Sequence, residues 1–223
     1  MNLIMTAATP FIQGNLKVET SAFRQNFLRM IQSYEAFPGQ KTIVLLNGSS
    51  GTPLISALGD LGWKIKFVPL TLGSLPTAML GIEGNSLRDQ IVIVPGDSYV
   101  KEGYKDLIRG LNKIDSKALI ATMKASGPTW SYIRVGDENR VLEIQEKREI
   151  SNQATTGMFA FQSGIDFLDS AKWAIKNKLS TEGAYFVSSC IQAMLILGHS
   201  VASTEISRNS GYVYFGNRED RIL

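Results

Sequence analysis

The sequence predicts an α/β protein with a doubly wound, mostly parallel mixed sheet, and three observations lead to this prediction. Short apolar segments alternate with amphipathic segments through the first half of the chain, as in open parallel sheets. A run of β-branched residues over 91–94 ends in Pro95, Gly96 and Asp97, as a buried parallel strand does when it delivers one acid to the carboxyl edge of a sheet. In the second half, two alternating segments flank a polar turn and indicate a β-hairpin.

The first half of the chain supplies the predicted parallel strands. An amphipathic pattern with one apolar face predicts a helix over 21–37, and Pro38 and Gly39 end it. Pro53 suits the first turn of another helix, with Thr52 as its cap. The other predicted elements are strands over 3–5, 41–46, 64–68 and 90–94 and a short helix over 76–83. Strands separated by helices imply right-handed crossovers.

The second half of the chain has a different character. A helix is predicted over 104–112 and a strong strand over 117–123. The hairpin comprises 131–135 and 140–145 around the polar segment 136–139. Residues 157–161 predict a further strand, and an apolar stripe from 165 to 175 predicts a helix. We expect one mixed α/β unit over 1–223, with a nucleotide-binding half over 1–115, an acceptor-binding half over 116–223, and the hairpin as a lobe over one edge.

Composition excludes several classes of protein. The formal charge of +3 comes from 23 basic and 20 acidic residues without a run of like charge, so we expect no nucleic acid polymer as a partner. No apolar stretch approaches the roughly 20 residues that span a bilayer, and the start lacks a signal peptide, so we expect a cytoplasmic protein without a membrane partner. The single cysteine, Cys190, lies in an apolar helical run and reads as a core thiol. The only histidine, His199, has no second histidine or cysteine for a zinc site.

Three segments in a fixed order carry a resemblance to a known family. They are 70–78, which contains Gly73 and Ser74, 142–147, which ends in Glu146 and Lys147, and 151–161. In this order, with Asp97 between the first two, they resemble the sugar-phosphate nucleotidyltransferases, also called nucleotide-sugar pyrophosphorylases. The resemblance runs from about 70 to 197 and is strongest over 131–161. It implies a GT-A-like, Rossmann-like sheet whose β-hairpin lobe covers the sugar site.

The resemblance also implies a reaction and a metal. A nucleoside triphosphate and a sugar 1-phosphate, or a similar phosphorylated acceptor, would give a nucleotide sugar and pyrophosphate. Asp97 would bind Mg²⁺ as metal ligand and catalytic residue, which suits a carboxylate placed beside nucleotide phosphates. The nucleotide-binding residues would be Gly73, Ser74 and Thr77, where glycine permits a flat base to approach the backbone closely.

The acceptor site follows from the same resemblance. Glu146 and Lys147 match the family's Glu-Lys pair, in which lysine, here also a catalytic residue, meets phosphate as a point charge and the carboxylate accepts from sugar hydroxyls. Thr156 and Gly157 match its Thr-Gly at the sugar pocket. From the residues alone, 146–149 also reads as a solvated, self-paired charged run.

Two departures from the family pattern concern phosphate and metal binding. The family follows its first strand with a glycine-rich loop that contains an arginine and then a Pro-Lys pair. Here 6–17 has one glycine and no arginine, Pro10 removes an amide donor, and Lys17 is the only nearby cation. Where the family places a second metal-binding aspartate, this chain has Tyr214, and Asp220 lies beyond it. A phenol at neutral pH is a poor Mg²⁺ ligand.

Three functions are compatible with these patterns. The first is a divergent nucleotidyltransferase with an unusual phosphate-binding segment. The second is a catalytically inactive relative that serves as a binding or regulatory module, which the altered loop favours. The third is a GT-A-type glycosyltransferase, although those enzymes commonly carry two aspartates around one residue and here Ser98 and Tyr99 follow Asp97. The base, the acceptor and any homo-oligomer stay open.

Overall fold

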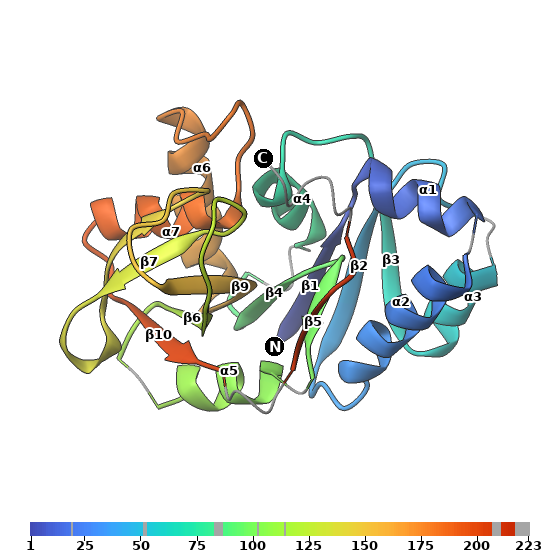
Figure 1. The fold of residues 1–223 in the computed structure, drawn as a ribbon, viewed down its shortest axis with the longest axis horizontal. Helices are drawn as coiled ribbons and strands as arrows, with labels where there is room; N and C mark the ends of the chain where they lie inside the picture. The colour runs from blue at the N-terminus through green and yellow to red at the C-terminus, as the bar shows by residue number, and fades with distance from the viewer. Residues whose placement is uncertain are drawn as a thin grey trace.

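A computed structural model of the protein describes a mixed α/β fold in which one twisted sheet is covered by helices on both faces (Figure 1). The structure describes residues 1–18, 20–50, 53–82, 87–101, 103–113, 115–206 and 211–216. Strands β1 to β3 and helices α1 to α3 form one side of the molecule in this view, and β6 to β10 with α6 and α7 form the other. Strand β4 joins the two sides, so the predicted fold class is confirmed.

The main sheet has the strand order β10-β6-β9-β4-β1-β2-β3. Its strands are β1 (Asn2–Ala7), β2 (Gln40–Leu46), β3 (Trp63–Val68), β4 (Ile91–Pro95), β6 (Ala118–Lys124), β9 (Gln153–Phe161) and β10 (Val201–Glu205). Every neighbouring pair on this path is parallel except the two that β9 forms, with β4 and β6. The sheet is therefore mostly parallel with one reversed strand near its centre.

Two apolar layers hold the helices against the sheet. Because side chains alternate along a strand, Leu3 and Met5 face one layer while Ile4 faces the other, and β2 and β4 alternate in the same way. The first layer is covered by α1 (Pro10–Val18), α2 (Ser21–Ser33), α3 (Pro53–Asp60) and α5 (Gly103–Leu111). The second layer is covered by α4 (Ser74–Gly81), α6 (Gly164–Lys176) and α7 (Val187–Ile196). The helices described here do not include one that is long and apolar enough to cross a membrane.

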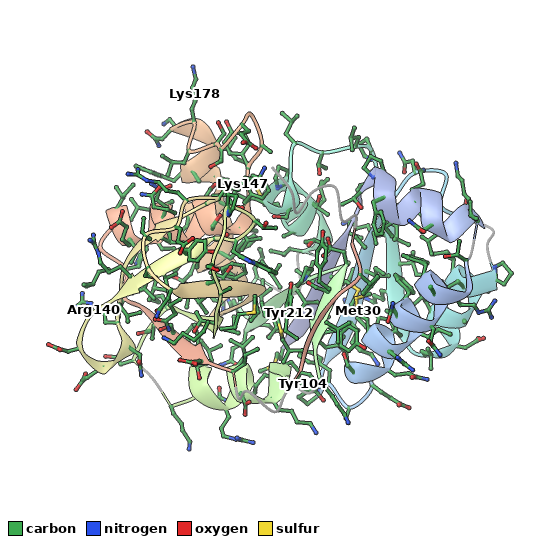
Figure 2. The ribbon with its side chains drawn as sticks, in the orientation of Figure 1. Met30, Tyr104, Arg140, Lys147, Lys178 and Tyr212 are labelled. Carbon is green, nitrogen blue, oxygen red and sulfur yellow. The ribbon has the colours of Figure 1, made fainter. Side chains whose placement is uncertain are left out.

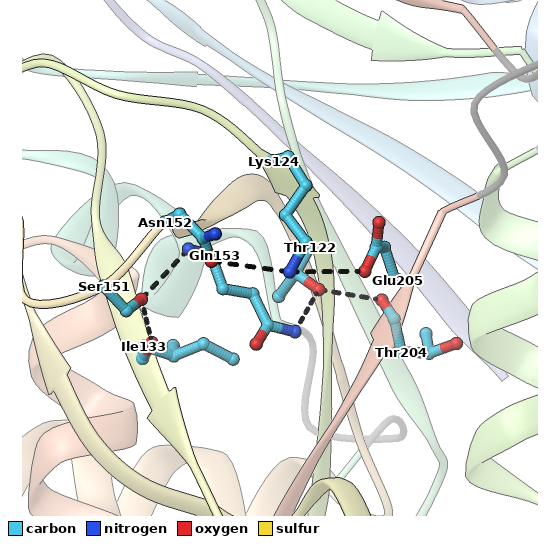
Figure 3. A network of polar contacts seen from close by, with 8 residues as sticks. All are labelled: Thr122, Lys124, Ile133, Ser151, Asn152, Gln153, Thr204 and Glu205. Atoms are coloured by element: carbon cyan, nitrogen blue, oxygen red, sulfur yellow. Dashed lines mark hydrogen bonds and ion pairs between the residues drawn. The ribbon is translucent and has the colours of Figure 1, made fainter.

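The hairpin is present and extends the sheet beside β9. It consists of β7 (Tyr132–Val135) and β8 (Val141–Gln145), joined by the 3₁₀ turn Asp137–Asn139. A polar network fixes its base, as Figure 3 shows. Ser151 Oγ donates to the carbonyl of Ile133 at 2.5 Å, and Gln153 Nε2 donates to the buried Thr122 hydroxyl at 3.0 Å. The network ties the hairpin and the start of β9 to β6.

A second ribbon lies beside the main sheet. It pairs β5 (Ser98–Val100) with β11 (Tyr212–Tyr214) in antiparallel fashion. The amide of Phe215 extends the pairing by donating to the carbonyl of Asp97 at 2.9 Å. The ribbon therefore brings the last described segment of the chain next to the end of β4.

The structure changes three of the expected boundaries. Residues 10–18, expected to be part of a phosphate-binding loop, form helix α1, and Pro10 occupies its first position, where a missing N–H costs little. Helix α4 begins at Ser74, two residues earlier than predicted, because Gly73 is its N-cap. Strand β9 begins at Gln153 rather than 157, so its polar first half lies inside the sheet. Thr52, the expected cap of α3, lies outside the described residues.

Two helical glycines should respond in opposite ways to alanine. A Cβ at Gly14 of α1 would meet open space, whereas a Cβ at Gly81 of α4 would lie 2.5 Å from Ile4 Cγ2 and 3.0 Å from Val44 Cγ2. We expect Gly14→Ala to raise the free energy of unfolding by about 0.5–1 kcal/mol. We expect Gly81→Ala to lower it by about 1–3 kcal/mol through overpacking. Urea denaturation of both variants measures these changes, and equal effects would contradict the assigned packing of α4.

Candidate active site

Asp97 stands where β4 leaves the sheet, and a close backbone contact puts it there. The amide of Gly96 donates to the carbonyl of Thr6 at 3.0 Å. A Cβ at Gly96 would lie 2.5 Å from the Cβ of Ala7 and 2.9 Å from the carbonyl oxygen of Thr6. Only glycine therefore allows the chain to cross the end of β1 at this point. The next residue, Asp97, lies at the carboxyl edge of the sheet, where open α/β proteins bind ligands.

Two cavities meet at this acid. One, of about 330 Å³, lies between β1, the segment before α4 and the start of α1. The other, of about 230 Å³, lies between β4, β9, the hairpin and the start of α7. Both are lined by Thr6, Ser74, Pro95, Asp97 and Phe186. We call the first the α1-side cavity and the second the hairpin-side cavity, and together they form one site with Asp97 at its centre.

The expected nucleotide-binding residues all line the α1-side cavity. Gly73 has φ +105°, and a Cβ there would overlap the backbone of Tyr185, whose amide nitrogen would be 2.9 Å away. Position 73 therefore requires glycine because the backbone of Tyr185 packs closely against it. Ser74 Oγ accepts from the amide of Val187 at 3.3 Å. Thr77 Oγ1 donates to the carbonyl of Gly73 at 3.1 Å and shares a hydrogen bond of 2.6 Å with the hydroxyl of Thr71, so Thr77 holds the turn.

Three helix N-termini point toward the two cavities. Thr9, Pro10 and Ile12 at the start of α1 line the α1-side cavity, and the Thr9 hydroxyl accepts from the amide of Ile12 at 3.2 Å. Ser74 begins α4, and Ser188 belongs to the first turn of α7. Each N-terminus carries a partial positive charge of roughly half a unit. Among the described residues, no lysine, arginine or histidine lines either cavity. Lys17, the cation expected nearby, is exposed at the opposite end of α1.

Glu146 is the acid of the hairpin-side cavity. It follows β8 directly, and its Oε2 accepts hydrogen bonds from the hydroxyls of Ser131 and Ser188, the latter at 2.5 Å. Burial raises the pKa of the Glu146 carboxyl above its ordinary value, while the two serine hydroxyls and the neighbouring Lys147 act in the opposite direction. The carboxyl group is therefore held in a fixed position in an environment that penalises its charge.

Lys147, expected to contact phosphate, lies at the rim rather than among the residues that line the cavity. Its Nζ forms an ion pair of 2.5 Å with Glu182 and lies 5.8 Å from the ring centroid of Phe186. The residue has φ +55°, in the left-handed region of the backbone map. Figure 2 shows Lys147 on the side of the hairpin lobe that faces α4.

Thr156 and Gly157 both line the hairpin-side cavity from within β9. The Thr156 hydroxyl donates to the carbonyl of Ala121 at 3.1 Å, so it links β9 to β6. Gly157 has φ +79°, and a Cβ there would lie 3.1 Å from the ring of Pro95. The neighbouring Thr155 also lines the cavity, at the register shift between β6 and β9. The predicted pair thus shapes the floor of the cavity through its backbone.

Several residues of the site were not predicted from the sequence. Trp130 and Tyr212 line the hairpin-side cavity with their ring centroids 5.5 Å apart and their planes at 76°. Phe186 lies where the two cavities join, and Ser131 and Ser188 hold Glu146. The two consecutive serines at 188–189, just before the apolar run of α7, could have indicated a binding residue. The same pair is equally typical of the start of a helix.

The far side of Asp97 is occupied by the end of β11. A Cβ on Gly216 would lie 2.9 Å from Asp97 Oδ2 and would also overlap the hydroxyl of Tyr214, so both oxygen atoms face the same glycine. Across the described part of the chain, no group of three histidine, cysteine, aspartate or glutamate side chains could together hold a metal ion. Asp220 lies outside the described residues. Cys190 is buried, with its Sγ 3.5 Å from the carbonyl of Phe167, and burial raises the pKa of its thiol, as expected for a core thiol.

Three solved structures with the same fold are similar to this chain along nearly its whole length. A nucleoside-diphosphate-sugar pyrophosphorylase from Vibrio cholerae RC9 aligns with a TM-score of 0.77 at 16% identity, over 99% of this chain and 97% of that chain. An inositol-1-phosphate CTP transferase from T. maritima aligns with a TM-score of 0.68 at 16% identity, over 98% and 90% of the two chains. A candidate glucose-1-phosphate thymidylyltransferase from Bacillus anthracis, in complex with sucrose, aligns at 0.71 and 14%, over 96% and 89%. At these identities the likeness shows the fold.

The family itself is shown by the sequence. A comparison with curated proteins finds no match. The family described as Nucleotidyl transferase matches residues 58–205, which include Asp97, Glu146 and most of both cavities. That span covers more than half of the chain and agrees with the family expected from the segment order. On this evidence the chain belongs to the nucleotidyl transferase family.

Proposed function

We propose that the protein transfers a nucleotidyl group from a nucleoside triphosphate to a phosphorylated acceptor of the sugar 1-phosphate class. An oxygen of the acceptor phosphate attacks the α-phosphorus, a new P–O bond forms, and the bond to the bridging oxygen breaks so that pyrophosphate leaves. The triphosphate binds in the α1-side cavity and the acceptor in the hairpin-side cavity. We further propose that the chain works as one unit, with 1–115 supplying most of the first cavity and 116–223 most of the second.

The observation that carries this proposal is the position of Asp97 between two cavities. Phosphoryl-type displacement depends on positioning and charge neutralisation rather than on covalent chemistry by the protein. A site of this kind needs two adjoining pockets and an acid at the point where donor and acceptor meet. Asp97 is one of five residues that line both cavities. A binding module would need neither the junction nor the acid, so the arrangement favours an enzyme.

The donor set suits Mg²⁺ held jointly by the protein and the substrate. Mg²⁺ usually keeps several waters and binds through one or two carboxylates together with substrate phosphates, so a single aspartate suffices. The ion would neutralise phosphate charge beside Asp97. The N-termini of α1, α4 and α7 would supply further positive potential where the family has the loop with arginine and Pro-Lys. Gly73, Ser74 and Thr77 would shape the base site, while Glu146, Lys147, Thr156 and Gly157 would bind the acceptor.

Asp97→Asn should abolish the reaction while leaving the fold intact. The amide keeps the size of the side chain but removes the charge that holds the metal ion. We expect pyrophosphate release with Mg²⁺, a nucleoside triphosphate and a sugar 1-phosphate to fall at least about 100-fold. Asp60→Asn, an exposed acid at the end of α3, is the matched control and should retain full activity. Equal turnover in the two variants would exclude Asp97 as the metal ligand.

Ser188→Ala should weaken acceptor binding selectively. It removes one of the two hydroxyls that hold Glu146 Oε2, and a hydrogen bond to a charged group contributes about 1.5–3 kcal/mol. We expect the KM for the acceptor to rise about tenfold or more while the KM for the nucleotide stays unchanged. Ser189→Ala, at the neighbouring buried position outside the cavity lining, should change neither constant. If Ser188→Ala raised the KM for the nucleotide more than the KM for the acceptor, the assignment of the acceptor to the hairpin-side cavity would be wrong.

A further inference from the structure

We propose that the acceptor carries a compact ammonium group, bound in the hairpin-side cavity between aromatic rings and the Glu146 carboxylate. This inference rests on the proposed function, because it names the chemical class of the acceptor in the same site. The shared chemistry is an ammonium group on a phosphorylated alcohol, which an amino alcohol or an amino sugar supplies.

Aromatic rings form the walls that an ammonium group requires. Trp130 and Tyr212 line the cavity as an edge-to-face pair, with planes at 76° and centroids 5.5 Å apart. Two rings at this angle make two walls of a corner. Phe159, Phe186 and Tyr214 also line the cavity. Cations are attracted to the faces of tryptophan, tyrosine and phenylalanine, and several such rings around one pocket are the usual means of binding alkylammonium groups.

The formal charges of the cavity point to the same class of ligand. Within the described residues, the only charged side chains that line it are Asp97 and Glu146. Asp97 is at the junction, where Mg²⁺ and phosphate would meet. Glu146 then remains as a carboxylate for the part of the acceptor away from the phosphate. Lys147 does not offset it fully, because its ammonium is paired with Glu182 at the rim.

The local geometry of Glu146 leaves one carboxylate oxygen for a ligand that donates a hydrogen bond. Both serine hydroxyls donate to Oε2, and no donor to Oε1 is found among the described residues. Lys147 and Glu182 are the other charged groups that act on this carboxyl, and Asp97 lines the same cavity. Burial raises the pKa of Glu146, and an opposite charge beside it would favour the ionised form. A bound ammonium group would therefore compensate the burial of this carboxylate.

Apolar side chains complete the lining beside the serine and threonine hydroxyls. The aliphatic and phenylalanine members are Ile93, Pro95, Phe159, Phe186 and Val187. Methyl or methylene groups around an ammonium centre would pack against these side chains.

Two matched pairs of acceptors test the charge alone. Phosphocholine is compared with 3,3-dimethylbutyl phosphate, its neutral carbon isostere, and glucosamine 1-phosphate with glucose 1-phosphate. Binding is measured by isothermal titration calorimetry without nucleotide, and pyrophosphate release is measured with Mg²⁺ and each common nucleoside triphosphate. We expect the charged member of at least one pair to bind about tenfold more tightly than its neutral partner. The pair that shows the preference identifies the source as an amino alcohol or an amino sugar.

Two variants place the preference in this cavity. Glu146→Gln keeps the shape of the side chain without its charge, and Trp130→Leu keeps an apolar group without the ring. Each should reduce the charged-over-neutral preference to about threefold or less. Phe67→Leu, an exposed aromatic on β3 outside both cavities, is the control and should keep the full preference. In the wild type the preference should grow as pH rises and Glu146 ionises, and in Glu146→Gln this dependence should be absent.

The outcomes separate this inference from the proposed function. Equal or tighter binding of the neutral member in both pairs overturns the inference, as does an undiminished preference in Glu146→Gln and Trp130→Leu. Pyrophosphate release from a neutral sugar 1-phosphate without any charge preference would support the proposed function while it overturns the inference. A charge preference without pyrophosphate release from any combination would support the ammonium site and contradict the enzymatic function.

Discussion

The contact between Gly96 and the end of β1 determines where the central acid of this protein can stand. The backbone of Gly96 lies against Ala7 and the carbonyl of Thr6 at distances that exclude any side chain. The chain therefore leaves β4 directly over β1 instead of turning away from it. Asp97 is placed at the line where the α1-side and hairpin-side cavities meet. The division of the site into two adjoining cavities depends on this one crossing.

The positive potential around the site has an unusual origin. The family resemblance implies phosphate binding by a glycine-rich loop with an arginine and a Pro-Lys pair. This chain instead connects β1 to α1 through Ala8 and Thr9 alone, and the first turn of α1 borders the cavity. Backbone amides at helix starts are fixed before the ligand arrives, so they lose little entropy on binding. They also carry only partial charges, so in the proposed reaction more of the neutralisation would fall to the Mg²⁺ ion.

Local sequence patterns were sufficient for the strand that leads to Asp97, for the hairpin that leads to Glu146 and for the alternation of strands and helices. Each of these elements has a regular spacing of apolar residues or ends at a residue that breaks regular secondary structure. Helix α1 was not predicted because the family resemblance implies a loop there, although Thr9 followed by Pro10 is an ordinary helix start. Trp130 could not be predicted, since it lies in an irregular segment and meets Tyr212 only through tertiary folding. The pairing of Lys147 with Glu182 is likewise a contact between distant segments.

The β5–β11 ribbon has a consequence for how the protein is made. Strand β5 continues directly from Asp97, and its partner β11 comes from the last described segment of the chain. During synthesis, β5 is therefore made long before its partner β11. A nascent chain that has emerged only as far as β10 could assemble the whole main sheet and both helical layers. It would still lack Tyr212 and the backbone donor that Phe215 gives to Asp97, so the wall of the hairpin-side cavity is complete only after 211–216 has joined β5.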